Sequence, residues 1–399
     1  MRKKLLLLCM FFLLLCGCSA QNELDELLVL TGIGIDESED GNVKLIFRAV
    51  NPHGSKSGME GGSSSQSPNY TFTSEGKNII EAFSNMHSIL GRQPFYSHVT
   101  ALVIGEAFAR NKGLKDIVNY MERHDQLRDS YLLFVAKESS AESIMNVFTP
   151  IENSSVFTME SMFNITGGAN TMADGIKLED FIKWVYGDDR AGAAMGVEKV
   201  DTHSSSNLDT LNNIDGNLNA IRLTSLGIFN KSRLTEWLSI KDTRTFAFLT
   251  DTASSSAPYT IACPEGEGSI SFLLKERNIK AEPKLEDGRI VYHVDLKGGV
   301  ILDGLTCPPS LASQDGISSL QNWIKESLKQ DFLEALENAK RSNLDYFGIK
   351  NHLYRNDTRQ WEQMKDNWEQ LYAEMEIKVN IRIFMESPGA RVDNNEDES

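Results

Sequence analysis

Apolar positions in the first half of the chain alternate between strand-like runs and helical spacing. The β-rich runs 28–35 and 43–50 flank a polar stretch that contains Asp40-Gly41, which predicts a hairpin. Strands that alternate with helices then indicate a layered α/β-type domain, which we place over residues 18–200. Compact apolar runs and apolar residues three or four positions apart predict buried strands at 98–104 and 131–136, and helices over 76–90, 114–128 and most of 140–185.

The pattern changes at residues 201–218, which are rich in Ser, Asn, Asp and Gly and poor in apolar residues. Such a composition is typical of a linker between domains. Farther on, Asp287-Gly288 predicts a hairpin turn. The elements predicted after the linker are strands at 222–229, 245–249, 259–263, 269–277 and 289–296, long helices over 317–340 and 358–375, and a strand over 376–385.

These patterns together predict a multidomain α+β protein with mixed sheets and packed helices. Its C-terminal α+β region, 219–389, forms one unit or two subdomains, and consists largely of antiparallel strands plus the two long helices. Residues 390–399 are polar and acidic, so we expect them to form a disordered tail.

The N-terminus carries the features of a bacterial export signal. Three basic residues precede the apolar run Leu5–Leu15, which is too short for a spanning helix of about 20 residues. The run ends in Gly17-Cys18, as in the lipobox of bacterial lipoproteins. We interpret residues 1–17 as a signal peptide and Cys18 as the lipidated cysteine, because two acyl chains anchor a protein stably. The alternative is an ordinary secretory signal with an incidental cysteine.

Charge and cysteine content narrow the choice of partners. The formal charge is −16, and removing the three positive charges of residues 1–17 takes it to −19. This charge argues against nucleic acid as a partner and against a polybasic attachment to anionic lipid, so Cys18 carries the membrane attachment. Of five cysteines, two leave with the signal peptide and Cys18 is lipidated. The remaining Cys263 and Cys307 form either a disulfide or two buried free thiols.

Fragments that resemble catalytic or metal motifs have the wrong spacing. Gly32-Ile33-Gly34 opens like a dinucleotide fingerprint, but Glu37 stands in place of the third glycine. Asp36 to Gly41 opens like a calcium loop, but Phe47 occupies the twelfth position. No two histidines stand at metal-ligand spacing. The sequence therefore predicts no catalytic residue, no metal site and no cofactor.

Three other features each have two interpretations. His98 opens a predicted buried strand, where backbone hydrogen bonding is the simplest role for it. The charged run Glu122–Asp129 is either a solvated helix face or a recognition surface. Trp361 and Trp368 share a helix face, which favours core packing over a groove for a partner.

A series of short motifs follows the lipobox. The first half holds Glu23-Leu24, Gly32-Ile33-Gly34-Ile35-Asp36, Asn51-Pro52, Glu75-Gly76, Glu81-Ala82, His98, Ile104-Gly105-Glu106, Ala109-Arg110, Gly113-Leu114, Arg123 and Arg128. The second half holds Gly227-Ile228-Phe229, Leu234, Trp237-Leu238, Asp345, Phe347-Gly348, Trp361, Trp368, the strand 377–385 and Gly389. In order and spacing they resemble the Ger(x)C family, the lipoprotein C subunits of nutrient germinant receptors in spore-forming bacteria. One departure is Ser19-Ala20, where the family usually has Trp-Asp.

The resemblance implies a mixed α+β protein of three domains on the outer face of the spore inner membrane. It implies that the protein acts beside two membrane-associated subunits in a receptor complex that starts germination when nutrients bind. It carries over no catalytic residue. The leading hypothesis is therefore a lipid-anchored, non-enzymatic receptor subunit. The alternatives are a substrate-binding lipoprotein of an uptake system, which usually has two similar α/β lobes around a cleft, and a cell-envelope enzyme.

Overall fold

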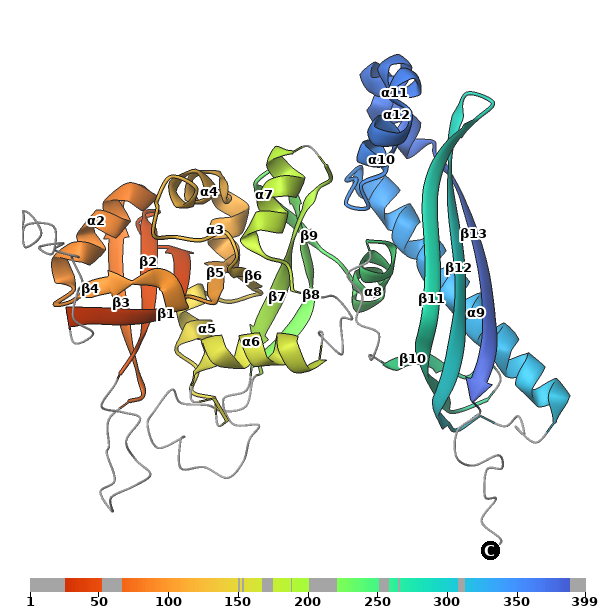
Figure 1. Cartoon of the computed structure of the whole chain (residues 1–399), viewed down its shortest axis with the longest axis horizontal. Coiled ribbons are helices and arrows are strands. Elements are labelled where there is room, and N and C mark those ends of the chain that lie inside the picture. The colour runs from red at the N-terminus through yellow and green to blue at the C-terminus, as the bar shows by residue number, and fades with distance from the viewer. Residues whose placement is uncertain are drawn as a thin grey trace, which may run out of the picture.

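The fold is α+β with two mixed sheets, as the sequence predicted (Figure 1). The computed structural model describes residues 26–51, 67–149, 151–152, 154–166, 175–187, 189–200, 221–250, 258–264, 266–307 and 313–387. Some predicted features lie outside these residues and stay predictions, namely the signal peptide 1–17, the lipidated Cys18, the linker 201–218 and the tail 390–399.

The first sheet has the strand order β3-β2-β1-β5-β6-β7-β8-β9, with β4 beside β1. Its central strands β1, β5, β6 and β7 run parallel. The predicted hairpin is confirmed, since β1 and β2 are antiparallel and Gly41 in their turn has a φ of +73°. The strands are β1 (Leu27–Glu37), β2 (Val43–Val50), β3 (Asn69–Gly76), β4 (Gln93–Phe95), β5 (Ala101–Gly105), β6 (Leu132–Ala136), β7 (Gly192–Lys199), β8 (Ile221–Asn230) and β9 (Arg233–Trp237).

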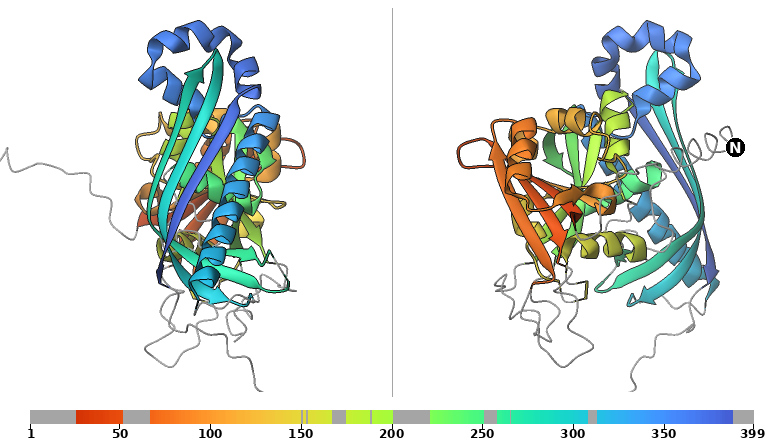
Figure 2. Two further views of the ribbon diagram at one scale, coloured as in Figure 1. Left: turned by 90° about the vertical axis from the view of Figure 1, so that its right-hand side faces the viewer. Right: turned by 60° about the vertical axis from the view of Figure 1, so that its left-hand side comes forward.

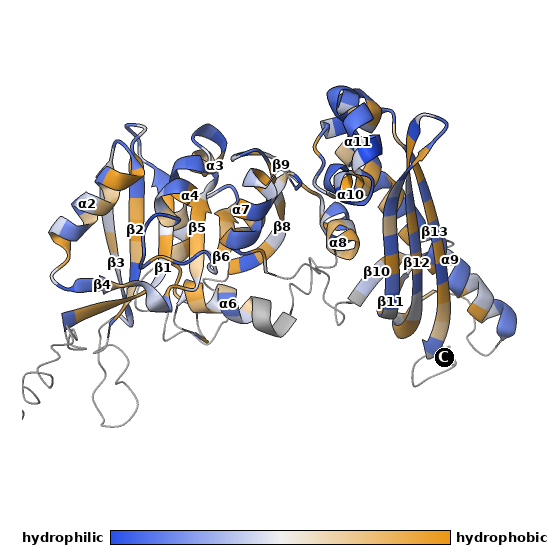
Figure 3. Ribbon diagram, turned by 45° about the horizontal axis from the view of Figure 1, so that its top comes forward, coloured by the Kyte–Doolittle hydropathy of each residue, from blue (hydrophilic) through white to orange (hydrophobic). Residues whose placement is uncertain are grey.

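Helices cover both faces of this sheet. The α2, α3 and α4 helices lie on one side, and α5 and α6 lie on the other (Figure 1). The β5 strand is therefore apolar throughout: Leu102 and Ile104 face the first layer, and Ala101 and Val103 face the second. Figure 3 shows the hydrophobic colour along β5. The helices are α2 (Ile79–Ile89), α3 (Glu106–Asn111), α4 (Lys115–Met121), α5 (Ala141–Met145), α6 (Ser155–Thr166) and α7 (Leu178–Tyr186).

The second sheet has the order β10-β11-β12-β13, and the long helix α9 crosses one face of it (Figure 2). The predicted turn Asp287-Gly288 joins β11 and β12, and both of its residues have positive φ. The strands β11 to β13 alternate polar and apolar along their length (Figure 3), because one face packs on α9. The elements are β10 (Pro258–Ala262), β11 (Ser269–Glu286), β12 (Arg289–Leu305), α9 (Gln314–Ser342) and β13 (Glu376–Ser387).

A single buried apolar cluster connects the two sheets through α8 (Ile240–Leu249). In α8, the Phe246 ring lies 6.4 Å from that of Trp184 in α7 and 6.3 Å from that of Phe347. Phe347 leads into short helices that cap one end of the second sheet. These are α10 (Ile349–Asn356), α11 (Thr358–Met364), the 3-10 turn η4 (Lys365–Asn367) and α12 (Trp368–Ala373).

Some element predictions were wrong. Residues 245–249 belong to α8 rather than to a strand, because the Ser239 side chain caps a helix that starts just after it. The helix predicted over 358–375 is broken into α11, η4 and α12. The strand predicted over 376–385 is present as β13, and it pairs with β12 in parallel.

The β7 and β8 strands, which flank the predicted linker 201–218, are antiparallel neighbours in the first sheet. The sheet therefore draws strands from both predicted regions. The β7 strand was not predicted, because its sequence from Gly192 to Gly196 is made of Gly, Ala and Met and lacks β-branched residues.

Candidate functional site

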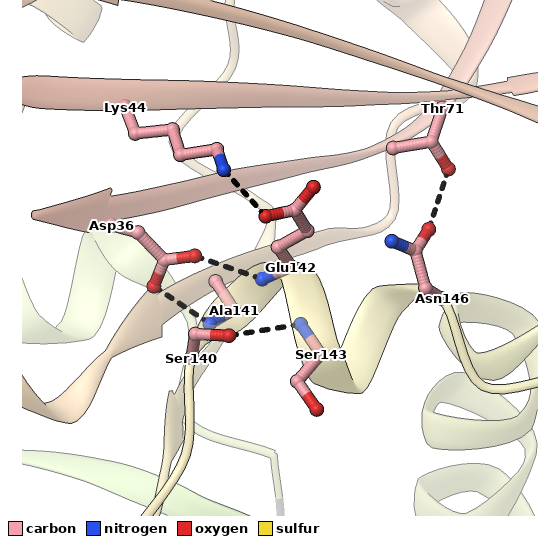
Figure 4. Close-up of polar contacts among 8 residues, drawn as sticks. All are labelled: Asp36, Lys44, Thr71, Ser140, Ala141, Glu142, Ser143 and Asn146. Atoms are coloured by element: carbon pink, nitrogen blue, oxygen red, sulfur yellow. Dashed lines mark hydrogen bonds and ion pairs between the residues drawn. The ribbon is translucent and has the colours of Figure 1, made fainter. Parts of the chain in front are cut away.

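The N-terminus of α5 holds a buried carboxylate from the neighbouring strand β1. Asp36 accepts hydrogen bonds from the backbone N–H groups of Ala141 at 2.7 Å and Glu142 at 2.9 Å (Figure 4). Ser140 caps the same turn by accepting from the Ser143 N–H at 3.1 Å. Burial raises the pKa of Asp36, and the two N–H donors and Lys44 counteract part of that shift.

This position matters because doubly wound sheets commonly bind phosphates where a helix begins after a parallel strand. Here α5 follows β6, and the chain's own Asp36 already occupies the N–H groups that an anion would need. The geometry therefore favours a structural cap over a nucleotide site. It agrees with the failed dinucleotide spacing around Gly32 and Gly34.

The glycines of this region let α5 lie close to the sheet. A Cβ added at Gly105 would overlap the Asp36 carboxylate, and one added at Gly34 would overlap the Met145 sulfur. The motif Gly32 to Asp36 thus has a packing role on one side and a capping role at its end.

The other side of α5 is tied to the β2–β3 hairpin by charged and polar side chains. Lys44 contacts Glu142 at 2.6 Å (Figure 4). Arg48, 2% exposed, donates to the Thr71 hydroxyl at 2.6 Å and to Asn146 at 3.3 Å. Burial lowers the pKa of Arg48 to about 10. Sequence reasoning missed Arg48, although an arginine within the apolar run Leu45–Val50 was a visible signal.

Glu106 lies at the carboxyl ends of the same parallel strands and connects three segments. Its carboxylate accepts from Arg110 at 2.8 Å, from the indole N–H of Trp237 at 2.9 Å and from the Glu138 backbone N–H at 2.6 Å. Burial opposes its ionisation, but these donors outweigh burial and lower the pKa of Glu106. Several of the short sequence motifs therefore meet at the carboxyl ends of the parallel strands, namely those at 36, 104–106, 109–110 and 237–238.

A second polar cluster lies where the two sheets meet. Asp345 accepts from the N–H groups of Ile349 at 2.9 Å and Lys350 at 2.7 Å, and its backbone carbonyl accepts from Ala191 at 2.9 Å. The Arg190 guanidinium lies 5.1 Å from the centre of the Trp184 ring. Burial raises the pKa of Asp345 and lowers that of Arg190, and each charge partly relieves the shift of the other.

The remaining predicted residues lie apart from these two clusters. His98 is exposed in a 3-10 turn, η2 (Tyr96–His98), because β5 begins three residues later than predicted. The charged run Glu122–Asp129 lies outside a helix, because α4 ends at Met121 rather than near the predicted residue 128. Most of its residues line a pocket of about 460 Å³ with Leu178 and Ile182 of α7. The rings of Trp361 and Trp368 lie 5.6 Å apart, with Trp361 buried in the core cluster.

The structure also locates the two remaining cysteines. Cys263, just after β10, and Cys307, just after β12, form a disulfide with Cα atoms 5.8 Å apart. Among the described residues, no three His, Cys, Asp or Glu side chains gather closely enough to hold a metal ion. None of the described helices is both long enough and apolar enough to cross a bilayer.

Comparison with known families covers both halves of the chain. The family described as spore germination protein N-terminal domain matches residues 20–197, and the family described as spore germination B3/GerAC like, C-terminal, matches residues 224–389. The chain belongs to the Ger(x)C family of spore germination proteins. This confirms the resemblance drawn from the motifs.

Individual Ger(x)C relatives match along most of their length. Spore germination protein KC of Bacillus subtilis (strain 168) is 24% identical over 95% of this chain and 94% of its own. Spore germination protein B3 of the same organism is 23% identical over 93% and 94%. The crystal structure of the GerBC protein superposes with a TM-score of 0.55 at 17% identity, covering 89% of this chain and 96% of that one, so the fold is shared.

Proposed function

We propose that this chain is a lipid-anchored, non-enzymatic subunit of a germinant receptor complex, required for the response to nutrient germinants. The observation that carries the proposal is the match of both Ger(x)C blocks behind a lipobox that ends in Cys18. The anchor places the chain on the outer face of the spore inner membrane. Its partners are two membrane-associated receptor subunits and, through Cys18, membrane lipid, but not nucleic acid.

The polar clusters support a non-enzymatic role. Asp36 and Asp345 accept hydrogen bonds from helix N-termini, and Glu106 is saturated by three donors. Carboxylates held in this way position backbone and are poor general bases, because a substrate proton would have to displace their donors. The charged side chains of these clusters therefore stabilise the fold.

The uptake alternative fits the architecture less well. A substrate-binding lipoprotein usually has two similar lobes, whereas here a sheet covered by helices on both faces stands beside a sheet crossed by one long helix. The two units differ in strand order and in connection, so they are not two copies of one lobe.

The experiment is germination of spores that lack this gene, scored against a panel of amino acids, sugars and nucleosides. We expect loss of the response to particular nutrients, with recovery when the intact gene is returned. A gene carrying Cys18→Ala, expressed at equal level, should not restore the response. Normal germination on every nutrient would contradict the receptor role, and full rescue by Cys18→Ala would contradict the role of the anchor.

A further inference from the structure

The start of β1 marks where the membrane anchor joins the folded body. If Cys18 is lipidated, the chain between Cys18 and Leu27 spans at most about 30 Å even when fully extended. The first residues of β1 therefore lie within that distance of the bilayer surface. Whatever surrounds them is held near the lipid headgroups.

The surroundings are the segment that leaves α2 and forms β4. In β4, Gln93 pairs with Leu27 and Phe95 pairs with Val29, in parallel register. Because paired residues point to the same face, Leu27, Val29 and Phe95 share one face of the sheet, and all three are only partly buried. Only three residues separate the end of α2 from β4, so the last turn of α2 lies near the start of β1, which pairs with β4.

This end of the molecule exposes apolar groups together with an arginine. Ile89, in the last turn of α2, is 52% exposed, and Arg92 and His98 are exposed as well. The His98 ring lies 5.7 Å from that of Phe95. We call Leu27, Ile89, Arg92, Phe95 and His98 the tether-side patch.

The charge pattern of the sequence sets this segment apart. The chain has 56 Asp and Glu among 399 residues, yet residues 84–105 contain none, and Arg92 is the one Lys or Arg in that stretch. The tether itself is acidic at Glu23, Asp25 and Glu26, so any favourable contact with an anionic surface has to come from the α2–β4 side. An apolar group beside a cationic one is typical of surfaces that settle into the headgroup region.

We propose that the tether-side patch rests on the membrane and gives the lipid-anchored chain one fixed orientation, with Ile89 and Phe95 at the level of the headgroups. The occupant is the lipid surface rather than a protein. The proposal rests on lipidation of Cys18, because an unanchored chain with formal charge −19 would be repelled by anionic lipid.

The same helix supplies a matched control. Ile80 is 66% exposed in the first turn of α2, and Ile89 is 52% exposed in the last. The two isoleucines lie at opposite ends of α2, about 14 Å apart along its axis. Only Ile89 lies at the end of α2 that leads into β4.

The test uses the full-length lipidated protein in vesicles of equal parts phosphatidylglycerol and phosphatidylethanolamine that contain nitroxide-labelled lipid. One variant carries Ile89→Cys and the other carries Ile80→Cys, each labelled with bimane, whose emission a nearby nitroxide quenches. We expect both variants to float with the vesicles. The nitroxide lipid should quench bimane emission at position 89 and leave the emission at position 80 unchanged. Adding Arg92→Glu to the first variant should restore part of the emission.

Flotation separates this proposal from the proposed anchor. A chain that does not float with the vesicles contradicts lipidation of Cys18. A chain that floats but keeps full emission at position 89 overturns the docking and leaves the anchor standing. Equal loss at both positions also overturns it, because the body would then lie on the bilayer without a preferred face.

Discussion

Asp36 and Asp345 are far apart in the sequence, yet each carboxylate accepts hydrogen bonds from two backbone N–H groups in the first turn of a helix. Glu106 plays a related role with three donors from separate segments. Hydrogen bonds to a charged group are among the stronger ones in proteins. Single buried charges therefore determine how segments of this chain are joined.

The substitution Glu106→Gln tests whether the Glu106 carboxylate stabilises the fold, because it replaces one carboxylate oxygen by an N–H₂ group. The amide keeps one acceptor for Trp237 and Arg110 but turns an N–H₂ group toward the Glu138 N–H. We expect the variant to lose about 1–3 kcal/mol of unfolding free energy at neutral pH, measured by urea denaturation. Glu39→Gln, the same change at an exposed position of the β1–β2 turn, should leave the transition midpoint unchanged.

The loss of unfolding free energy in Glu106→Gln should become smaller as the pH falls. The pKa of Glu106 is lowered in the folded state from its ordinary 4.5, so its contribution is complete above that value and disappears as pH falls through the folded pKa. The difference between wild type and Glu106→Gln should therefore narrow in acid. A difference that stays constant from pH 7 to pH 3 would show that the ionised carboxylate is not the stabilising group.

At the scale of elements, α5 is held by its neighbours more than by its own length. It is a five-residue helix, too short to be stable alone. Asp36 holds its start, and Arg48 with Asn146 holds its end. Its closeness to the sheet depends on glycines at 34 and 105.

Gly105→Ala should push the Asp36 carboxylate away from the α5 N-terminus. The added methyl group overlaps that carboxylate in a fully buried strand end, and overpacking of this kind costs about 1–3 kcal/mol. Gly91→Ala is the control, because an added Cβ there meets nothing within 4 Å. Combined with Asp36→Ala, the Gly105→Ala deficit should shrink, since the clashing group is gone. If the stability losses of Gly105→Ala and Asp36→Ala simply add in the double variant, the clash is refuted.

The Cys263–Cys307 disulfide ties the ends of β10 and β12 across a sequence separation of 44. By the loop-closure relation, opening it should cost about 4 kcal/mol, most of it through the unfolded state. Replacing both cysteines by Ser should lower the urea midpoint, and reductant should lower that of the wild type equally. Insensitivity of the wild type to reductant would mean that the thiols are free in the native protein.

Sequence patterns predicted the elements whose local signals agree with their surroundings. The β1–β2 and β11–β12 hairpins have Gly-containing turns between strand-like runs, and both were predicted correctly. The β7 strand was missed because its Gly and Ala residues suit close packing, with Gly196 lying under the Trp237 ring. Trp237 itself meets Glu106 only through the fold, so no local pattern could have paired them.

On the scale of the whole molecule, the first sheet extends beyond the boundary that composition suggests. The strands β8 and β9 follow the predicted linker 201–218, yet β8 pairs with β7 and β9 carries the Trp237 that contacts Glu106. A chain cut at residue 200 would leave β7 as an exposed edge and Glu106 without its indole donor. Folding of the first unit should therefore require residues on both sides of the linker.

Two fragments decide this point. Residues 26–238 contain every strand of the first sheet, whereas residues 26–200 lack β8 and β9. We expect the longer fragment to unfold cooperatively in urea and the shorter one to aggregate or bind a hydrophobic dye, because Ala194 and Met195 lose the strand beside them. Cooperative unfolding of 26–200 at the same midpoint would show that the sheet is complete without β8 and β9. Failure of both fragments would extend the folding unit to α8 and the second sheet, which share the same buried cluster.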